Sequence, residues 1–456
     1  MKRLFFRGIS FILLAILLIS NFTGCTLATN EEKTPVPEWS DNATMYEVNI
    51  RQYTKEGTFE AFSEHLPRLQ KMGVKILWFM PVHPISKVKR NGVLGSYYSV
   101  ADYYETNPEF GTKEDFKRLV DQCHEMGFKV IMDWVANHTG WDNEWIKKHP
   151  EWYTKNDKGE IVYPETWQDV ADLNYNNKSM QKAMLKAMTY WVKEFDVDGF
   201  RCDYAGGVPY EFWEKARKKL EKIKPVYMLA EDNSSMALLK YAFNSNYGWS
   251  LYNDLNSIAK GSKKAESLKS YFLSTIKTYP DGTYPLHFID NHDENSWNGT
   301  VEERMGDAQQ AMLALIFTAP GMPLIYSGQE VNLNHRLKFF EKDEIIWDDF
   351  VNEELLTKLI HLKIDHKALW NGDAGGNIKF FETSSSRVLA YMREKDNDKV
   401  VAILNLSDRD VEAKINLEND YTGTDLFTSE EITLKSGENK FNLEPWEFMI
   451  LSSSNN

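Results

Sequence analysis

The sequence predicts an α/β fold: a closed (β/α)8 barrel of the TIM type, with a short lateral loop domain after its third strand and a C-terminal antiparallel β-sandwich domain. Three observations lead to this prediction. Eight apolar runs of strand length recur along the chain, helical patterns lie between them, and after Gly375 short runs alternate without a helical period. Strands alternating with helices form a parallel sheet, and eight such units favour a closed barrel. A doubly wound open sheet is the alternative, although no Gly-rich phosphate turn follows the first strand.

The strand candidates are short apolar runs bounded by polar or turn-forming residues. They are Met45 to Ile50, Val74 to Met80, Phe128 to Asp133, Val197 to Asp203, Val226 to Glu231, Tyr247 to Tyr252, Leu286 to Asn291 and Met322 to Ser327. Helical periods lie at 59–73, 180–195, 209–224, 262–277, 302–317 and 351–366. Another helix starts in a capping-box-like arrangement of Thr112 with Asp115 and ends at Gly127, and it places Cys123 on its apolar face.

The N-terminus has the pattern of an export signal. Lys2, Arg3 and Arg7 precede an apolar run from Ile9 to Ile19, which has the length of a signal-peptide core and is too short to span a bilayer. The run ends in Phe22-Thr23-Gly24-Cys25, which resembles a bacterial lipobox although Phe22 replaces the usual Leu. We therefore expect cleavage before Cys25, lipidation of Cys25, and an exported protein anchored at the outer or periplasmic face of a bacterial membrane. A plain secretory signal is the alternative.

These patterns divide the chain into successive parts. Residues 1–24 are expected to be the signal peptide, 25–40 a flexible tether, 41–370 the catalytic barrel and 371–456 the C-terminal β domain. The segment 137–172 shows no clear period and is longer than an ordinary strand-to-helix loop, so it forms the lateral loop domain. Because long loops at the carboxyl ends of barrel strands build active sites, we expect this segment to form a wall of the substrate cleft.

Charge and aromatic content narrow the classes of ligand. The chain has 67 acidic and 53 basic residues, a net charge of -14, which disfavours nucleic acid as the main partner. An uncharged or cationic substrate fits better. Aromatic residues make up 13% of the chain, and stacking on sugar rings or other ligands is one use for them, besides packing of the core.

Several predicted strands end in a carboxylate, which is where a barrel places its catalytic groups. Asp133, Asp203 and Glu231 end three runs, and Asp293 follows another by two residues. A single acid there is most often a helix cap, but four in polar clusters favour a site. Arg201 is two residues before Asp203, so strand alternation points both into the barrel mouth and turns the intervening cysteine outward.

The motifs around these acids resemble those of the α-amylase family of glycoside hydrolases. Five of them occur in the family's order: Asp133-Trp134-Val135-Ala136-Asn137-His138, Gly199-Phe200-Arg201-Cys202-Asp203, Leu229-Ala230-Glu231, Phe288-Ile289-Asp290-Asn291-His292-Asp293, and Asp172-Leu173-Asn174 at the end of the lateral loop. The resemblance covers about residues 41 to 370, and the β tail agrees with the family's C-terminal domain. A retaining α-glycosidase is the activity it implies.

The resemblance also implies roles for individual residues. Asp203 is expected to be the nucleophile, kept ionised by Arg201, and Glu231 the general acid and base, because the apolar run before it favours desolvation and a raised pKa. Asp293 is expected to stabilise the transition state. The expected substrate-binding residues are Tyr98, Asp133, His138, Arg201 and His292. Tyr97 is a neighbouring rival to Tyr98 for stacking on the sugar in the cleavage subsite.

A structural calcium ion is a further implication of the resemblance. In many family members Ca²⁺ ties the lateral loop to the barrel through the Asn of the first motif and the Asp of the short motif, here Asn137 and Asp172. Oxygen ligands of this kind suit a hard cation. The backbone carbonyl near Gly207 is the candidate for a third ligand.

Within the family, the expected substrate is an α-glucan or maltooligosaccharide cleaved mainly at α-1,4 bonds, and an endo-acting α-amylase is favoured. The loop Arg51 to Thr58 lacks the Asp- and Gly-rich calcium turn that many α-glucosidases and neopullulanases of the family carry. Little chain precedes Met45 for the extra N-terminal β domain of the cyclodextrin-cleaving members. Both absences favour the endo enzyme by elimination. Many α-amylases carry, after the nucleophile, a Lys-His pair that contacts the sugar on the leaving-group side. This chain reads Tyr204-Ala205-Gly206-Gly207 there, so the resemblance does not extend to the acceptor subsites. An exo-acting α-glucosidase or transglycosylase is the nearest alternative. A non-catalytic surface glycan-binding lipoprotein, or a barrel that has lost catalysis, is disfavoured by the complete carboxylate set.

Overall fold

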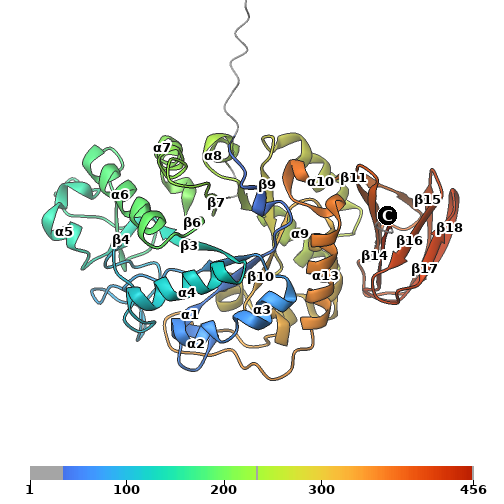
Figure 1. Cartoon of the computed structure of the whole chain (residues 1–456), viewed down its shortest axis with the longest axis horizontal. Helices are drawn as coiled ribbons and strands as arrows, with labels where there is room; N and C mark the ends of the chain where they lie inside the picture. The colour runs from blue at the N-terminus through green and yellow to red at the C-terminus, as the bar shows by residue number, and fades with distance from the viewer. Residues whose placement is uncertain (1–33, 233–234, 454–456) are drawn as a thin grey trace, which may run out of the picture. The chain divides into compact units, whose positions relative to one another are not determined.

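Eight parallel strands close into a barrel in the computed structural model, which describes residues 34–232 and 235–453 (Figure 1). The strand order around the barrel is β1-β10-β9-β8-β7-β6-β3-β2. The strands are β1 Met45–Val48, β2 Ile76–Phe79, β3 Lys129–Val135, β6 Gly199–Asp203, β7 Tyr227–Ala230, β8 Ser245–Tyr247, β9 Tyr284–His287 and β10 Met322–Tyr326. The predicted closed barrel is confirmed, and the doubly wound alternative is excluded because β1 pairs with both β2 and β10.

Helices follow the barrel strands. They are α1 Ile50–Tyr53, α2 Phe59–Ser63, α3 Leu66–Met72, α4 Lys113–Glu125, α6 Lys178–Glu194, α7 Tyr210–Leu220, α8 Met236–Tyr241, α9 Trp249–Ala259, α10 Ser267–Thr278, α11 Val301–Met305, α12 Gln309–Thr318 and α13 Glu353–Asp365. The α4 helix starts as its sequence predicts: the side chains of Thr112 and Asp115 each accept a hydrogen bond from the other residue's backbone N–H. Cys123 lies buried on its inner face, and both Cys123 and Cys202 are free thiols.

One predicted strand is wrong in its position. The run Tyr247 to Tyr252 was expected to be the sixth strand, but β8 ends at Tyr247 and α9 begins at Trp249. The buried residues Leu251, Leu255 and Ile258 are spaced three or four apart, so they form the inner face of the helix. A short apolar run is compatible with either a buried strand or a buried helix, and periodicity alone does not separate them.

Strand alternation divides the apolar residues into two layers. Met45, Ile76, Leu229 and Leu324 belong to a cluster inside the barrel, whereas their neighbours such as Leu77 pack outward against the helices. Cys202 also faces the helix layer, as predicted from its place between Arg201 and Asp203. The inward positions near the carboxyl ends of the strands are therefore the ones left for polar side chains.

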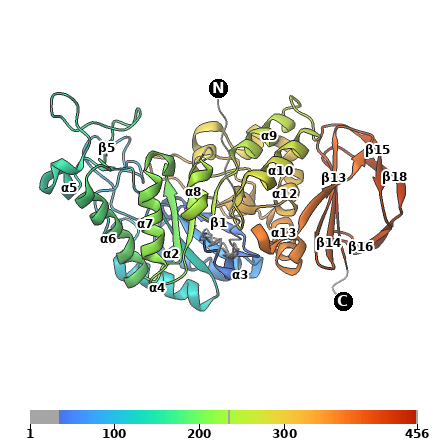
Figure 2. The same cartoon turned by 90° about the horizontal axis from the view of Figure 1, so that it is seen from above.

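The lateral segment between β3 and α6 contains a small antiparallel pair, β4 His138–Gly140 with β5 Val170–Asp172, and the short helix α5 Glu144–Lys148. His138 is opposite Asp172 in this pair. Figure 2 shows α5 and β5 beside α6, at the side of the barrel away from the C-terminal strands. The pairing fixes the two ends of the long loop together and holds it beside the barrel mouth.

The C-terminal part is an antiparallel β domain with two sheets. The larger has the order β11-β13-β14-β19-β16-β17 and the smaller β12-β15-β18. Their strands are β11 Asn377–Phe380, β12 Glu382–Thr383, β13 Val388–Lys395, β14 Asp398–Asn405, β15 Val411–Leu417, β16 Tyr421–Asp425, β17 Glu431–Leu434, β18 Gly437–Leu443 and β19 Phe448–Ser452. Leu389 and Tyr391 join the core that includes the barrel helices, whereas Val388 and Ala390 face the second sheet. The predicted β-sandwich domain is confirmed.

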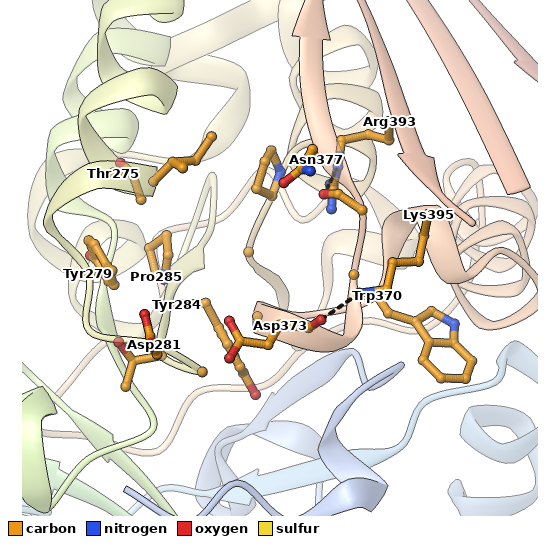
Figure 3. Close-up of a pocket in the computed structure, with 18 of the residues that line it drawn as sticks. Thr275, Tyr279, Asp281, Tyr284, Pro285, Trp370, Asp373, Asn377, Arg393 and Lys395 are labelled. Carbon is orange, nitrogen blue, oxygen red and sulfur yellow. Dashed lines mark hydrogen bonds between the residues drawn. The ribbon is translucent and has the colours of Figure 1, made fainter. Parts of the chain in front are cut away.

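A cavity of about 710 Å³ lies between the barrel and this β domain. Its barrel side is formed by Tyr284 and Pro285 at the start of β9 and by Gly321 before β10. Figure 3 shows Asp373 and Lys395 at its edge, where Lys395 Nζ donates a hydrogen bond of 2.8 Å to the carbonyl oxygen of Asp373. Although large, this cavity is at the amino ends of the strands, whereas barrel active sites form at the carboxyl ends.

The predicted tether, residues 25–40, includes residues that contact the barrel. Thr34 Oγ1 donates to the carbonyl oxygen of Leu239 at 3.0 Å, and Asn244 Nδ2 donates to that of Pro35 at 2.8 Å. Residues 34–40 therefore pack on the barrel instead of forming part of a free linker that runs to residue 40. Cys25 and the signal segment lie outside the described residues. Within 34–232 and 235–453, no helix has the length and apolar character needed to cross a membrane.

Candidate active site

The four acids predicted at strand ends meet at one end of the barrel. Asp133 lies within β3, Asp203 is the last residue of β6, Glu231 directly follows β7, and Asp293 comes after β9. A cavity of about 380 Å³ opens there. It is lined by Asn91, Ser96, Tyr98, His138, Trp167, Asp169, Val170, Asp203, Tyr204, Glu231, Asp293, Trp297, Phe339 and Phe340. The lateral segment supplies Trp167 and Asp169, so it forms a wall of this cavity as expected.

Arg201 connects three of the carboxylates beneath the cavity. Its Nη1 donates hydrogen bonds to Asp133 Oδ1 at 2.9 Å and to Asp203 Oδ1 at 3.0 Å. Its Nη2 lies 2.9 Å from Glu231 Oε1, an ion pair by distance in which the N–H is not aligned for a hydrogen bond. One guanidinium therefore brings the side chains of Asp203 and Glu231 to the same place.

Burial sets the protonation of the two carboxylates that face the cavity. Burial raises the pKa of Asp203 to about 6, although Arg201 favours its charged form. Burial likewise raises the pKa of Glu231 to about 7, against the opposing effect of Arg201 and with further increases from Asp203 and Asp293. As the pH rises, Asp203 therefore ionises before Glu231, which is the order that a nucleophile and a general acid require.

Three of the predicted substrate-binding residues lie behind the cavity surface. Asp133 and Arg201 are fully buried and His292 is 2% exposed, and they are absent from the cavity lining. Asp133 Oδ2 accepts hydrogen bonds from Trp78 Nε1 at 3.2 Å and from the hydroxyl of Tyr98 at 3.0 Å. The three residues hold the lining side chains Tyr98 and Asp203 from beneath, and their direct contact with a sugar stays a prediction.

His292 is held between two acids and a tyrosine. Its Nδ1 contacts Glu47 Oε1 at 2.5 Å, and its Nε2 lies 2.8 Å from the hydroxyl of Tyr98 and 3.4 Å from Asp293 Oδ2. Burial alone lowers the pKa of His292, but Asp293 and Glu47 together raise it to about 9. A charged imidazolium at this position places Tyr98 and Asp293 relative to each other on one side of the cavity.

Tyr98 and Tyr97 point to different places. Tyr98 lines the cavity, and its ring stacks on His292 with 5.5 Å between centroids and 24° between planes. Tyr97 is 1% exposed and packs against Arg51, whose guanidinium is 4.3 Å from its ring. The structure therefore leaves Tyr98 as the residue able to face a sugar. His138 also lines the cavity, and burial lowers its pKa to about 4, so it is neutral.

Several site residues were missed by sequence reasoning. Glu47 in β1 supports His292, Tyr247 accepts a hydrogen bond of 3.1 Å from Arg201 Nε, and Trp167, Tyr204 and Trp297 line the cavity. A carboxylate inside the apolar run Met45–Val48 was the one sequence feature that could have indicated Glu47. The aromatic residues come from loops far apart in sequence, and nothing local distinguishes them from core residues.

The three predicted calcium ligands lie around the junction of the lateral segment and the barrel. A Cβ atom on Gly207 would lie 2.7 Å from Asn137 Oδ1, while Asn137 Nδ2 points to His138 Nδ1 at 3.3 Å. The Oδ1 of Asn137 thus faces the backbone of Gly207. Asp172 is opposite His138 in the small sheet, and burial raises its pKa. These oxygens suit a hard cation in kind, but the described residues contain no cluster of three acidic, His or Cys side chains for a metal.

Comparison with known families agrees with this geometry. The family described as "Alpha amylase, catalytic domain" matches residues 38–170 and 150–369, and "Maltogenic Amylase, C-terminal domain" matches residues 378–450. The first match contains the barrel and the lateral segment with all four acids. The second covers most of the C-terminal β domain.

Individual relatives are similar over most of this chain. A solved structure of a noncanonic maltogenic α-amylase AmyB from Thermotoga neapolitana is 30% identical, with a TM-score of 0.84 over 91% of this chain and 99% of that chain. The α-amylase MalA of Haloarcula japonica is 27% identical over 86% of this chain, which spans 59% of the relative's length. A maltogenic α-amylase of Bacillus acidopullulyticus is 27% identical over 87% of this chain and 70% of its own length.

Proposed function

The chain belongs to the α-amylase family of glycoside hydrolases, and from this premise we propose that it hydrolyses α-1,4-glucosidic bonds in maltooligosaccharides and starch-type glucans with retention at the anomeric carbon. One observation carries the proposal. Asp203 and Glu231 lie within 3.0 Å of the two terminal nitrogens of Arg201, both facing a cavity, with pKa values of about 6 and about 7. A binding protein has no need of such a pair.

The proposed reaction has two displacements at the anomeric carbon. Asp203 attacks this carbon while Glu231 gives its proton to the glycosidic oxygen, so the bond to the leaving sugar breaks and a glycosyl ester on Asp203 forms. Glu231, now ionised, takes a proton from water, which attacks the same carbon and releases Asp203 as a carboxylate. Asp293, beside the cationic His292, accepts hydrogen bonds from sugar hydroxyls and stabilises positive charge on the flattened ring.

Short maltooligosaccharides are the preferred substrates in this proposal. A cavity of about 380 Å³ is at the small end of the range for ligand sites, and relatives named maltogenic α-amylase and cyclomaltodextrinase support small products. Endo action on starch is the second candidate, favoured by Trp167 and Trp297, which are 37% and 52% exposed at the cavity and offer aromatic surface for a longer chain.

Product analysis tests both candidates. Purified protein is incubated with maltotriose, maltotetraose, a cyclomaltodextrin, soluble starch and pullulan, and the products are sized over time, with Asp203→Asn as the control. We expect higher kcat/KM for maltotriose and maltotetraose than for starch, and maltose or glucose from the first samples. An early mixture of long oligosaccharides from starch would instead establish the endo enzyme. The pullulan product reports the linkage: maltotriose indicates cleavage at α-1,6 bonds, and panose indicates cleavage at α-1,4 bonds. Absence of activity on all five substrates would overturn the function.

We also propose a structural calcium ion held by Asn137, Asp172 and the backbone at Gly207. Bound there, the ion would supply cross-linking of the lateral segment to the barrel, since Gly207 follows β6 and Asp172 ends β5. The support is the placement of Asn137 Oδ1 toward Gly207 and the half-buried carboxyl of Asp172. Thermal unfolding of the protein before and after chelation measures how much such an ion stabilises the fold.

Export and lipid anchoring through Cys25 remain part of the proposal on the strength of the basic, apolar and Gly-Cys pattern of residues 1–25. An anchored enzyme would act on glucans that reach the cell surface or periplasm. Labelling of producing cells with radioactive palmitate, with Cys25→Ser as the control, tests this: label in the natural protein alone is expected, and no label in either protein would contradict lipidation.

A further inference from the structure

Tyr204 directly follows the predicted nucleophile and makes a backbone contact with the predicted acid. Its N–H donates a hydrogen bond of 2.8 Å to Glu231 Oε2. Its backbone is left-handed, with φ of 42° and ψ of 48°, a conformation that is strained for a residue with a side chain. Such strain persists where the surroundings hold it, and it is often found at functional sites.

The side chain of Tyr204 is held by the lateral segment. Its hydroxyl donates a hydrogen bond of 2.7 Å to Glu165 Oε1, and Glu165 also has a left-handed backbone, with φ of 48°. The ring lies over Gly207, where a Cβ atom would collide with it. This explains the Tyr-Ala-Gly-Gly sequence after the nucleophile: the second glycine leaves the space that the ring occupies.

The ring of Trp167 packs edge to face against the ring of Tyr204. Their centroids are 5.1 Å apart and their planes meet at 82°. The ring of Trp167 also packs on that of His138, with 5.6 Å between centroids. Both Trp167 and Tyr204 line the cavity, and Trp167 is 37% exposed. Tyr98 belongs to a different group of contacts: its ring stacks on His292, and its hydroxyl donates a hydrogen bond to Asp133. The cavity therefore has two aromatic walls, one connected to Glu231 and one to His292.

We propose that Trp167 and Tyr204 form the subsite for the glucosyl residue on the leaving-group side of the scissile bond, and that Glu165 holds Tyr204 in place for it. The inference rests on the proposed function. Glu231 protonates the oxygen that joins the leaving sugar. Tyr204, whose backbone N–H contacts Glu231, and Trp167, whose ring packs on that of Tyr204, therefore lie on the side of the cavity that the leaving sugar occupies. Aromatic rings offer an apolar face to the C–H face of a pyranose. The same subsite receives the acceptor sugar when a sugar hydroxyl, instead of water, attacks the glycosyl ester.

Two substrates with the same donor part separate this subsite from the chemistry. Maltotriose and α-maltosyl fluoride both place maltose in the donor sites, but the leaving group is glucose in one and fluoride, which needs no sugar subsite, in the other. The variants are Trp167→Ala, Tyr204→Phe and Glu165→Gln, with Tyr210→Phe as control, since Tyr210 is 49% exposed on α7 and outside the cavity lining. Tyr204→Phe retains the N–H that contacts Glu231.

We expect Trp167→Ala to lower kcat/KM for maltotriose by about tenfold or more, the scale of a lost apolar contact, and to change kcat/KM for α-maltosyl fluoride less than about twofold. Tyr204→Phe and Glu165→Gln are expected to show the same selectivity with smaller losses. With glucose added to α-maltosyl fluoride, the ratio of maltotriose formed to maltose released should fall in Trp167→Ala and stay at the natural value in Tyr210→Phe.

Each other outcome has a definite meaning. Equal losses on both substrates would overturn the subsite, because they show a general effect on the site. Unchanged activity of all three variants on both substrates would also overturn it. If the natural protein converts neither substrate, the proposed function itself fails, which is distinguishable from failure of the subsite alone.

Discussion

The Nη2 atom of Arg201 lies 2.9 Å from Oε1 of Glu231, so the cation that the sequence places beside Asp203 also faces the proposed general acid. No basic residue lies next to Glu231 in the sequence, which predicts the raised pKa of this group from desolvation alone. Burial does dominate, since the pKa of Glu231 is about 7 in spite of Arg201. The shared guanidinium couples the two carboxyl groups, and this coupling determines the first prediction.

Activity should follow a narrow bell-shaped pH profile. Asp203, with a pKa of about 6, must be ionised, so activity rises as the pH increases through that value. Glu231, with a pKa of about 7, must be protonated, so activity falls as the pH increases further. We expect the kcat/KM of maltotriose hydrolysis to be highest between these values, with both limbs belonging to the coupled pair. A profile that is flat from about pH 5 to 9 would contradict these roles.

The anomeric configuration of an azide product should identify the two roles. Asp203→Asn and Glu231→Gln are each expected to lower kcat for maltotriose by at least about 10²–10⁴-fold. With azide and α-maltosyl fluoride, Glu231→Gln should form α-maltosyl azide through the enzyme ester, whereas Asp203→Asn should form the β anomer by direct attack. Proton NMR of the products distinguishes them.

Both variants should remain folded, because each neutral amide replaces a carboxyl group whose ionised form burial disfavours. Thermal unfolding midpoints close to that of the natural protein are the control. The same azide anomer from both variants would contradict the assignment.

Glu47→Gln should lower the pKa of His292. Asp293 and Glu47 raise this pKa to about 9 against the effect of burial, so removing the charge of Glu47 makes the neutral imidazole more populated at pH 7. NMR titration of the histidine ring measures the shift, and kcat is expected to fall several-fold at pH 7 as Tyr98 and Asp293 lose a charged neighbour. Glu412→Gln, exposed on β15, is the matched control. An unchanged His292 pKa would contradict the contact.

Chelation should lower the thermal unfolding midpoint if calcium binds at Asn137 and Asp172. Addition of Ca²⁺ should restore the midpoint, while Mg²⁺ at equal concentration should not, because Mg²⁺ requires a tighter octahedral shell. Asn137→Ala should unfold at one temperature with or without chelator. The control is Asp157→Asn, exposed in the same lateral segment, which should respond as the natural protein does. A midpoint of the natural protein that is insensitive to chelator would remove calcium from the proposal.

Local sequence patterns predicted the architecture and the acidic residues of the site. The alternation of strands and helices predicted the closed barrel, and the two-residue period placed Arg201 and Asp203 inward with Cys202 among the helices. These features depend on neighbours within a few residues, where periodicity is informative. The boundary between β8 and α9 was predicted wrongly because an apolar run gives no period that separates strand from helix.

The sequence by itself determined which carboxylates gather at the barrel mouth, since each lies near or just beyond the carboxyl end of a strand of one parallel barrel. Only the tertiary structure decided which side chains face the cavity and which lie behind it: closure of the barrel buries Asp133 and Arg201, and burial, more than the neighbouring cation, sets the pKa of Asp203 and Glu231. The hydrogen bond between Tyr204 and Glu165 joins residues 39 positions apart. Desolvation and contacts of that range depend on how the whole chain packs, and no local pattern records them.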